Sequence, residues 1–274
     1  MVFSQTLSPA DAAIMETFVV PRYLSLFGDL ALEMLLVGEG ARVVHLGCRT
    51  GYPDLKILDR THGAALVGLD SSQPALDLAR NKAAALGDVP ITYSLAEHLP
   101  VEVDGDVFSH AICLHPQVST TERLPVFQEM HRLLYAGGQA LIALPLRGSF
   151  LEITDLFKEY ALKNDDADLS EAIENAFQTR PSIETLSDEL ESIGFEDVDV
   201  EIRHTEISFD SGRALVEDPL CRLLVLPEVR SWLGVNDLAA STAYLRDAVD
   251  KYWSEDKFEL TVNVGCASAR KPTR

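Results

Sequence analysis

The chain has 274 residues, 47% of them hydrophobic, and can therefore bury a substantial core as one large domain or two small ones. Its 43 acidic and 23 basic side chains give a net charge of −20. This balance argues against nucleic acid and anionic lipid as partners, since both are bound through lysine and arginine. No basic segment followed by an apolar stretch opens the chain, and no run of about 18 uncharged apolar residues occurs, so we expect neither a secretory signal nor a membrane span.

The N-terminal segment predicts two helices. The first begins with Ser8 as its N-cap and Pro9 in the first turn, and we expect Pro21 to interrupt it. The second carries apolar residues at helical spacing as far as Gly38.

Short apolar strands then alternate with helices. Strands are predicted at 41–47, 64–70, 91–97, 107–115 and 139–145, and helices at 54–63, 72–87 and 121–138, the last of which we expect to stop at a double glycine. Strands that are apolar nearly throughout indicate a parallel sheet covered on both faces. The crossovers in such a sheet make it a doubly wound α/β fold.

The second half of the chain is acidic. Residues 150–218 contain 20 acidic and 5 basic side chains, which indicates either a solvated face or a partner surface. Helices are predicted at 152–163, 168–178, 183–193 and within 211–253, and strands at 194–209 and 257–272. We find no repeat or linker and predict a single domain, with N-terminal helices at 1–38, a core at 39–203, a helical insertion or lid at 204–256 and a last strand at 257–274.

The four cysteines are far apart and form no CxxC pair. This pattern favours reduced, mostly buried thiols over a disulfide framework or a zinc site, so we expect a cytoplasmic protein without a metal centre. The cysteines are Cys48, Cys113, Cys221 and Cys266.

The loop within VVHLGCRTGYP, residues 43–53, is the strongest candidate for a ligand site. Ligands of an open α/β sheet bind beyond the carboxyl ends of its strands, where small residues let backbone N–H groups approach. Asp70 ends the next strand about 20 residues later, at the spacing of a carboxylate that accepts hydrogen bonds from ribose hydroxyls. Its alternative role is to cap the following helix. The GxGxxG spacing of dinucleotide dehydrogenases and the GKS/T ending of phosphate loops are absent.

Four segments occur in the order and spacing of a known family: VVHLGCRTG, GLDSSQPALDLARNKA, AEHLP and FQEMHRLLYAGGQALIALP. Together they resemble class I S-adenosylmethionine-dependent methyltransferases, most nearly the small-molecule group typified by quinone-biosynthesis methyltransferases. The resemblance covers residues 30–150 and extends to 185–203 and 257–271. It implies a seven-stranded, Rossmann-like sheet with an antiparallel last strand, a lid formed by the remaining helical segments, and S-adenosylmethionine as cofactor.

The resemblance also implies a role for each strand end. The loop would surround the methionine part of the cofactor, Asp70 would hold the ribose, and Ser71 would flank the adenine. The segment after the third strand would edge the adenine, and the end of the fourth strand would face the sulfonium and the acceptor. The other residues so implied are Gly47, Cys48, Arg49, Thr50 and Gly51 in the loop, Ala96 and Glu97 after the third strand, and Leu114 and His115 after the fourth.

Four residues depart from the family pattern, and we expect all four to belong to the ligand shell. His45 stands where the family has an acid that helps to fix the loop and the methionine ammonium. Arg49 stands where the family has glycine, and its side chain could swing out to solvent, pair with the cofactor carboxylate or fill the cofactor's space. Leu95 and Ser109 also replace acids. Losing two hydrogen bonds to charged groups would weaken cofactor binding by roughly 10²- to 10⁴-fold.

Methyl transfer depends mainly on alignment, and a general base helps where the acceptor is a hydroxyl or an acidic carbon. His115 is the best-placed candidate base, the alternative being a hydrogen-bonded turn histidine. We therefore expect an S-adenosylmethionine-dependent methyltransferase acting on a small molecule. The rival hypothesis is a catalytically silent methyltransferase fold that acts as a regulatory or scaffolding partner of another protein, for which His45, Arg49 and the acidic surface argue. A third hypothesis, methylation of basic protein tails, has only the acidic surface in its favour.

Overall fold

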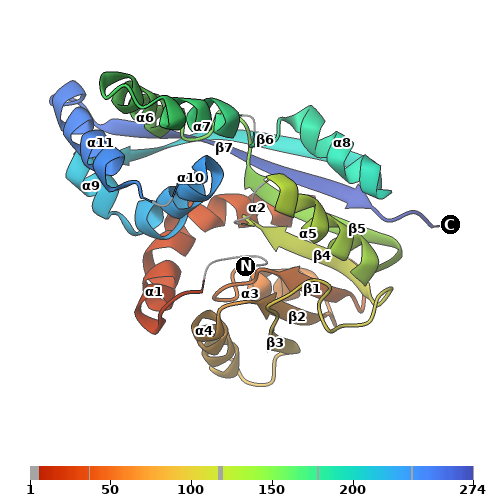
Figure 1. The fold of residues 1–274 in the computed structure, drawn as a ribbon. Helices are drawn as coiled ribbons and strands as arrows, with labels where there is room; N and C mark the ends of the chain where they lie inside the picture. Colours follow the sequence, from red (N-terminus) through yellow and green to blue (C-terminus); the bar gives the residue numbers. More distant parts are fainter. Residues whose placement is uncertain (1–5, 37, 117–119, 178, 236, 274) are drawn as a thin grey trace. The chain divides into compact units, whose positions relative to one another are not determined.

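The computed structural model describes residues 6–36, 38–116, 120–177, 179–235 and 237–273. Seven strands form one sheet in the order β3-β2-β1-β4-β5-β7-β6 (Figure 1). Neighbouring strands from β3 to β5 are parallel. β7 runs antiparallel to β5, because Gly137 is hydrogen-bonded to Lys271 whereas Leu146 is bonded to Asn263. The strands are β1 (Arg42–Leu46), β2 (Ala65–Asp70), β3 (Ile91–Leu95), β4 (Phe108–Leu114), β5 (Leu134–Pro145), β6 (Glu196–Phe209) and β7 (Phe258–Arg270). The predicted α/β fold with an antiparallel last strand is confirmed.

The centre of the sheet explains the apolar strand sequences. Every residue of β4 is buried, and so is every residue of β1 after its first, as expected for parallel strands that are covered on both faces. The register aligns Leu46 with both Leu69 and Cys113. The carboxyl ends of β1, β2 and β4 therefore lie at one level, and the loops that follow them are neighbours.

The chain divides into two compact units. Unit 1 comprises Met1–Leu144, Ile183–Glu201 and Gly265–Arg274, and unit 2 comprises Pro145–Ser182 and Ile202–Val264. Within the described residues, no helix is long and apolar enough to cross a membrane. The helical elements are α1 (Pro9–Ile14), η1 (Met15–Leu24), α2 (Ser25–Met34), α3 (Asp54–Arg60), α4 (Gln73–Ala84), α5 (Thr120–Leu133) and α8 (Ile183–Ile193) in unit 1, and α6 (Leu151–Lys163), α7 (Ala167–Phe177), α9 (Gly212–Glu217), η2 (Cys221–Val225), α10 (Leu226–Leu233) and α11 (Ala239–Tyr252) in unit 2.

The N-terminal helices begin as predicted but are not interrupted by Pro21. The Ser8 hydroxyl accepts a hydrogen bond from the main-chain N–H of Asp11 at 3.1 Å, which confirms the N-cap. Pro21 lies inside η1, a π-helix that leads directly into α2. The wider π-helical turn accommodates a residue that has no N–H to donate. The Pro21 carbonyl in turn accepts a hydrogen bond from the Ser25 hydroxyl at 2.9 Å.

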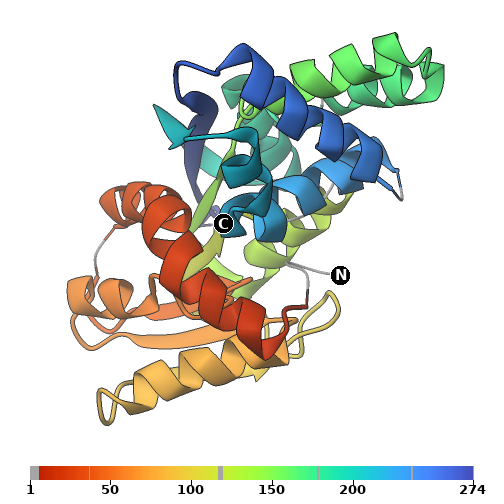
Figure 2. The same cartoon turned by 90° about the vertical axis from the view of Figure 1, so that its left-hand side faces the viewer.

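The first helix packs against α4 within unit 1 (Figure 2). The main-chain N–H of Leu7 donates to the Ser72 hydroxyl at 3.0 Å. Lys82 on α4 lies 2.6 Å from the Glu16 carboxylate and donates to the Thr50 carbonyl at 2.9 Å. These contacts hold the N-terminal helices over the loops that follow β1 and β2.

The predicted end of α5 is wrong. The helix ends at Leu133 and β5 begins at Leu134, so the double glycine lies inside the strand. Leu134 pairs with Phe108, and the next aligned pair is His110 with Gln139, so the register is irregular between them. The second half of the chain follows the prediction, with α6, α7 and α8 near the expected ranges and four helical elements between 211 and 253.

Candidate functional site

The loop after β1 is a tight turn held to the end of β2. The main-chain N–H groups of Gly47 and Cys48 both donate to the Leu69 carbonyl, at 2.7 and 3.2 Å. The turn closes when the Gly51 N–H donates to the Cys48 carbonyl at 2.8 Å. Gly51 has a φ of +79°, and a Cβ there would lie 2.5 Å from the Tyr93 hydroxyl. This position therefore requires glycine both for its backbone conformation and for space.

Cys48 turns its side chain away from the loop. It packs in a buried cluster with Leu76, Ala79 and Tyr93, beside α4 and β3. Burial raises the pKa of its thiol, and the nearby carboxylates of Asp70 and Asp54 raise it further. Cys48 thus offers its backbone, and not a nucleophilic sulfur, to a ligand at this edge.

Asp70 joins the two strand-end loops. Its side chain is fully buried, and its carboxylate accepts hydrogen bonds from the main-chain N–H groups of Arg49 at 3.0 Å and Ser72 at 2.8 Å. The second contact is an Asx turn that leads into α4, and not the helix cap that the sequence left as an alternative, because Ser72 is the N-cap of α4 and α4 has no side-chain cap. The first fixes the loop after β1 beside the same carboxylate. Ser71, between these residues, is half-buried.

Arg49 lies inward, across the carboxyl edge of the sheet. Its φ of +48° is in the left-handed region and its side chain is 4% exposed. The guanidinium donates to the main-chain carbonyls of Leu114 at 2.8 Å and His115 at 2.5 Å. Its Nε has no hydrogen-bond acceptor among the described residues. Burial lowers the pKa of Arg49, and the negative charge of Asp70 opposes that shift. The sequence left three placements open for the Arg49 side chain, and the one exposed to solvent is not observed.

His45 pairs with an acid that the sequence analysis did not identify. Its Nδ1 lies 2.6 Å from a carboxylate oxygen of Asp54, and the two side chains are 1% and 0% exposed. Asp54 is the first residue of α3, directly after the loop. An acid is therefore present beside the loop, supplied by a helix start rather than by the strand. The spacing of an acid just after Gly51 and Pro53 is the signal that could have identified it.

His115 is covered by the N-terminal helices. It is fully buried with a φ of +49°, and its Nε2 lies 2.8 Å from the Tyr23 hydroxyl. The rings of Tyr23 and Phe27 meet the imidazole edge-on, each with centroids 5.2 Å away. Tyr23 is a second contact that the sequence analysis missed, because it comes from a helix remote in sequence.

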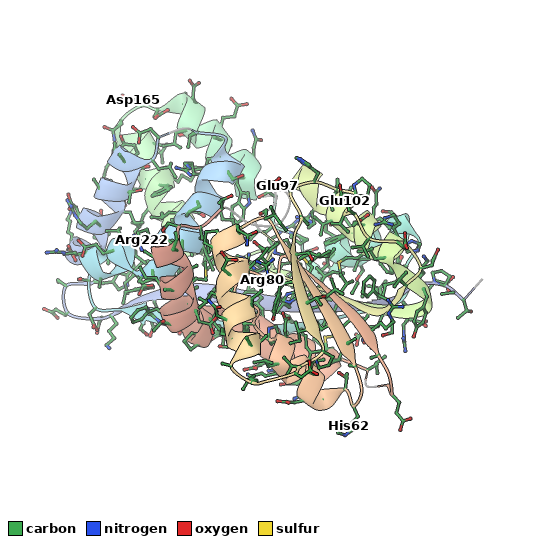
Figure 3. The ribbon with its side chains drawn as sticks, turned by 90° about the horizontal axis from the view of Figure 1, so that it is seen from below. His62, Arg80, Glu97, Glu102, Asp165 and Arg222 are labelled. Carbon is green, nitrogen blue, oxygen red and sulfur yellow. The ribbon has the colours of Figure 1, made fainter. Side chains whose placement is uncertain are left out.

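The segment after β3 lies at the same edge. The main-chain N–H of Ala96 donates to the Asp70 carbonyl at 2.9 Å, and Ala96 is buried whereas Glu97 is exposed (Figure 3). Leu95 is 44% exposed and is therefore available to a ligand or to solvent.

Ser109 does not belong to this edge, and the expectation that it does is wrong. Its hydroxyl is hydrogen-bonded to the main chain of Arg42, the first residue of β1, at 2.9 Å. It therefore lies at the amino ends of the strands, remote from the loops.

A small cavity adjoins the loop after β1. Its space is only about that of a single water molecule, and its lining includes Val20, Leu24, Arg49 and Leu114. Small-molecule sites are far larger. The polar groups match a nucleoside with a charged tail, since a carboxylate suits ribose hydroxyls and a guanidinium suits a carboxylate. The space does not match, because the Arg49 side chain crosses it. A ligand of that size fits here only after Arg49 moves.

No group of three or more metal-ligating side chains gathers in the part of the chain that the structure describes.

Known proteins resemble this chain over the segment that contains the loop after β1 and Asp70. Residues 43–138 match the methyltransferase domain family. The methyltransferase GfsG of Streptomyces halstedii is 28% identical over 123 residues, and this match spans 44% of each chain, less than half the length of that relative.

Solved structures share the fold at low sequence identity. The [4+2]-cyclase SpnF has a TM-score of 0.54 and 18% identity, covering 90% of this chain and 80% of its own. The YcgJ protein of Bacillus subtilis has a TM-score of 0.58 and 12% identity, covering 89% and 97%. Phosphoethanolamine N-methyltransferase 2 of Haemonchus contortus, in complex with S-adenosyl-L-methionine, has a TM-score of 0.55 and 17% identity, covering 97% and 60%. Residues 43–138 therefore match the methyltransferase domain family, within a chain that has the class I methyltransferase fold.

Proposed function

We propose that the chain is an S-adenosylmethionine-dependent methyltransferase that acts on a small molecule. The observation that carries the proposal is the buried Asp70 carboxylate, placed against the loop after β1 at the carboxyl edge of the sheet. The match of residues 43–138 to a methyltransferase domain supports it. Because the cyclase SpnF shares this fold, the fold alone does not identify the reaction. The proposal therefore rests on the residues of the site.

Each strand end has a proposed task. Asp70 and Ser71 would hold the ribose, Ala96 and Glu97 would edge the adenine, and the turn from Gly47 to Gly51 would surround the methionine part. S-adenosylmethionine supplies a methyl group on a positively charged sulfur when it is bound. His115 is the proposed general base, and the Tyr23 hydroxyl would hold its ring in one orientation.

Arg49 closes this site in the arrangement described here. Cofactor binding requires the guanidinium to leave the carbonyls of Leu114 and His115. Hydrogen bonds that involve a charged group contribute about 1.5–3 kcal/mol each, so Arg49 competes with the cofactor and weakens its binding. We therefore propose that the cofactor affinity of the wild-type chain is impaired, and that Arg49 is the cause.

Titration calorimetry of Arg49→Gly with S-adenosylmethionine and S-adenosylhomocysteine tests both proposals. Glycine adopts the positive φ of position 49 without strain, so the loop should be retained. We expect at least tenfold tighter binding than in the wild type, because two competing hydrogen bonds are lost. Adding Asp70→Asn to Arg49→Gly should abolish the gain, since the ribose-binding carboxylate is removed.

The outcomes separate the two proposals. Equal affinities of wild type and Arg49→Gly would exclude Arg49 as the cause of impairment while leaving the methyltransferase proposal standing. No heat with either ligand from either protein, each shown to be folded by its thermal transition, would exclude the cofactor proposal. The result would then support the silent scaffold, which the family match does not favour.

A further inference from the structure

Unit 2 contains a pocket that is large enough for a small molecule. Its space is about 360 Å³, within the range of small-molecule sites. Its lining comes from α6, α7, α10 and α11 and from the residues next to them, and within this unit α7 packs against α6 and α10 while α11 packs against α6 (Figure 1). All of the lining residues belong to unit 2.

Apolar side chains form most of the walls. Leu169 and Leu233 are 7% and 8% exposed, and the half-buried Leu238 lines the pocket beside them. Tyr160 adds an aromatic ring, whose centroid lies 5.6 Å from that of the Tyr244 ring. These walls offer apolar contact to the body of a ligand.

The charged side chains of the lining are all aspartates, and no basic side chain accompanies them among the described lining residues. Asp166 accepts a hydrogen bond from the main-chain N–H of Leu169 at 3.0 Å, and Asp237 accepts one from that of Ala239 at 2.7 Å. Each of these bonds uses one carboxylate oxygen, Oδ1, and so fixes the side chain while the second oxygen can accept from a ligand. Asp168, in the first turn of α7, is exposed at the rim.

The arrangement of these carboxylates indicates which kind of cation they suit. Within the described residues, no three metal-ligating side chains gather closely enough to hold a metal ion. Two of the acids stand at the start of α7 and the third stands two residues before α11, so the negative charge is spread around the pocket. An organic cation that carries an apolar body matches both the spread charge and the walls.

We propose that this pocket binds a small organic ammonium, whose apolar body contacts the walls and whose charged nitrogen meets the carboxylates of Asp166, Asp168 and Asp237. Apolar walls with a few placed polar groups are typical of small-molecule sites. Charge complementarity selects a cation over a neutral or anionic molecule of the same shape. The inference does not rest on methyl transfer, since it uses only residues of unit 2, and its failure leaves the proposed function untouched.

Three probes separate the charge from the apolar body. 2-Phenylethylamine carries both, because a primary amine is protonated at neutral pH. 2-Phenylethanol keeps the body without the charge, and methylamine keeps the charge without the body. Titration calorimetry and ligand-detected NMR on the full chain should show saturable binding of 2-phenylethylamine, with each of the other probes at least tenfold weaker.

The triple variant Asp166→Asn, Asp168→Asn, Asp237→Asn removes the charge and keeps the side-chain shape. Asparagine also accepts the two main-chain hydrogen bonds, so the helix starts should be retained. Each exposed ion pair contributes up to about fivefold in affinity, so losing three should lower the affinity for 2-phenylethylamine at least tenfold. The affinity for 2-phenylethanol should stay the same.

Asp165→Asn is the matched control. Asp165 is exposed next to the acidic rim but does not line the pocket, and asparagine suits its φ of +52° (Figure 3). This variant removes one charge from the same surface and should leave the affinity for 2-phenylethylamine unchanged. A second test, Ala172→Phe, keeps every carboxylate but narrows the pocket, because Ala172 lines it on α7, and it should abolish binding.

The proposal is overturned if the wild type shows no saturable binding of 2-phenylethylamine. Equal affinity for 2-phenylethanol would also overturn it, and so would equal affinity for methylamine, which would show only general attraction to a chain of net charge −20. If the triple variant does not fold, binding of 2-phenylethylamine that survives Ala172→Phe overturns the proposal, and loss of that binding supports it.

Discussion

Arg49 and Asp70 are coupled through the backbone of the loop. The Arg49 N–H donates to the Asp70 carboxylate at 3.0 Å, while the Arg49 guanidinium is bonded to main-chain carbonyls on the next strand. A buried charge is costly unless it is compensated, and the negative charge of Asp70 supplies part of that compensation. A ligand that recruits Asp70 therefore also changes the environment of Arg49. Under the proposed function, cofactor entry and release of Arg49 would in this way be one event.

The pairing of His45 with Asp54 changes which variants are informative. An acid at position 45 matches the family pattern, but here it would face a second buried carboxylate where the two partners now lie 2.6 Å apart. Two buried carboxylates at this distance repel each other. Restoring the family residue at this position would therefore destabilise the loop, and Arg49→Gly alone is the cleaner test.

His110 makes the stability of the protein depend on pH. Burial lowers its pKa, its hydrogen bond to the Leu36 carbonyl opposes the shift, and the charge of Arg270 adds to it. Below about pH 6.5 the unfolded chain binds a proton that the native state resists, so this contribution to stability is present above that pH and lost as pH falls. Urea unfolding should give a falling free energy between about pH 7 and pH 5, and His110→Gln should make the fall less steep.

His62 provides the control for this profile. It lies exposed in the turn after α3 and carries the same ring (Figure 3). His62→Gln should leave the pH profile unchanged. A profile for His110→Gln as steep as that of the wild type would show that other groups determine the slope.

At the level of elements, the strands were predictable and some element ends were not. An apolar run such as RVVHL identifies a covered strand because burial acts on every residue of it. The end of α5 was not predictable, because Leu134 joins β5 by pairing with Phe108, a contact between residues 26 positions apart. Pro21 was misread for a similar reason. Its effect depends on the helical hydrogen-bond pattern, and η1 is a π-helix.

The packing of β2 against β3 leaves no room for a side chain at Gly68. A Cβ there would lie 2.5 Å from Cδ1 of Tyr93 and 2.9 Å from the Cys48 sulfur. We expect Gly68→Ala to destabilise the protein by about 1–3 kcal/mol, as overpacking of a core does, measured by urea unfolding. Gly38→Ala is the control, since nothing lies within 4 Å of its added Cβ. Equal stabilities of the two variants would contradict this account of the packing.

For the whole molecule, contacts between residues that are far apart in the sequence could not be predicted from the sequence. Asp70 could be located because strand end and spacing are local properties. The Tyr23–His115 contact joins residues 92 positions apart, so it depends on how the N-terminal helices pack. The division into two units likewise depends on which segments gather in space, and no linker marks it in the sequence.

The four cysteines are buried, and each unit contains at least one of them. Cys48, Cys113 and Cys266 belong to unit 1 and Cys221 to unit 2. Burial raises the pKa of Cys113 and of Cys266 to about 12, which suppresses the reactive thiolate. Native protein at pH 8 should react with an aromatic disulfide reagent at least about 100-fold more slowly than unfolded protein, because exposing a thiol requires an opening that costs about 3 kcal/mol or more. Comparing the thiol-labelling rates of wild type and Cys221→Ala across a urea series then shows whether unit 2 opens before unit 1. Rapid labelling of any thiol in the native state would contradict the burial described here.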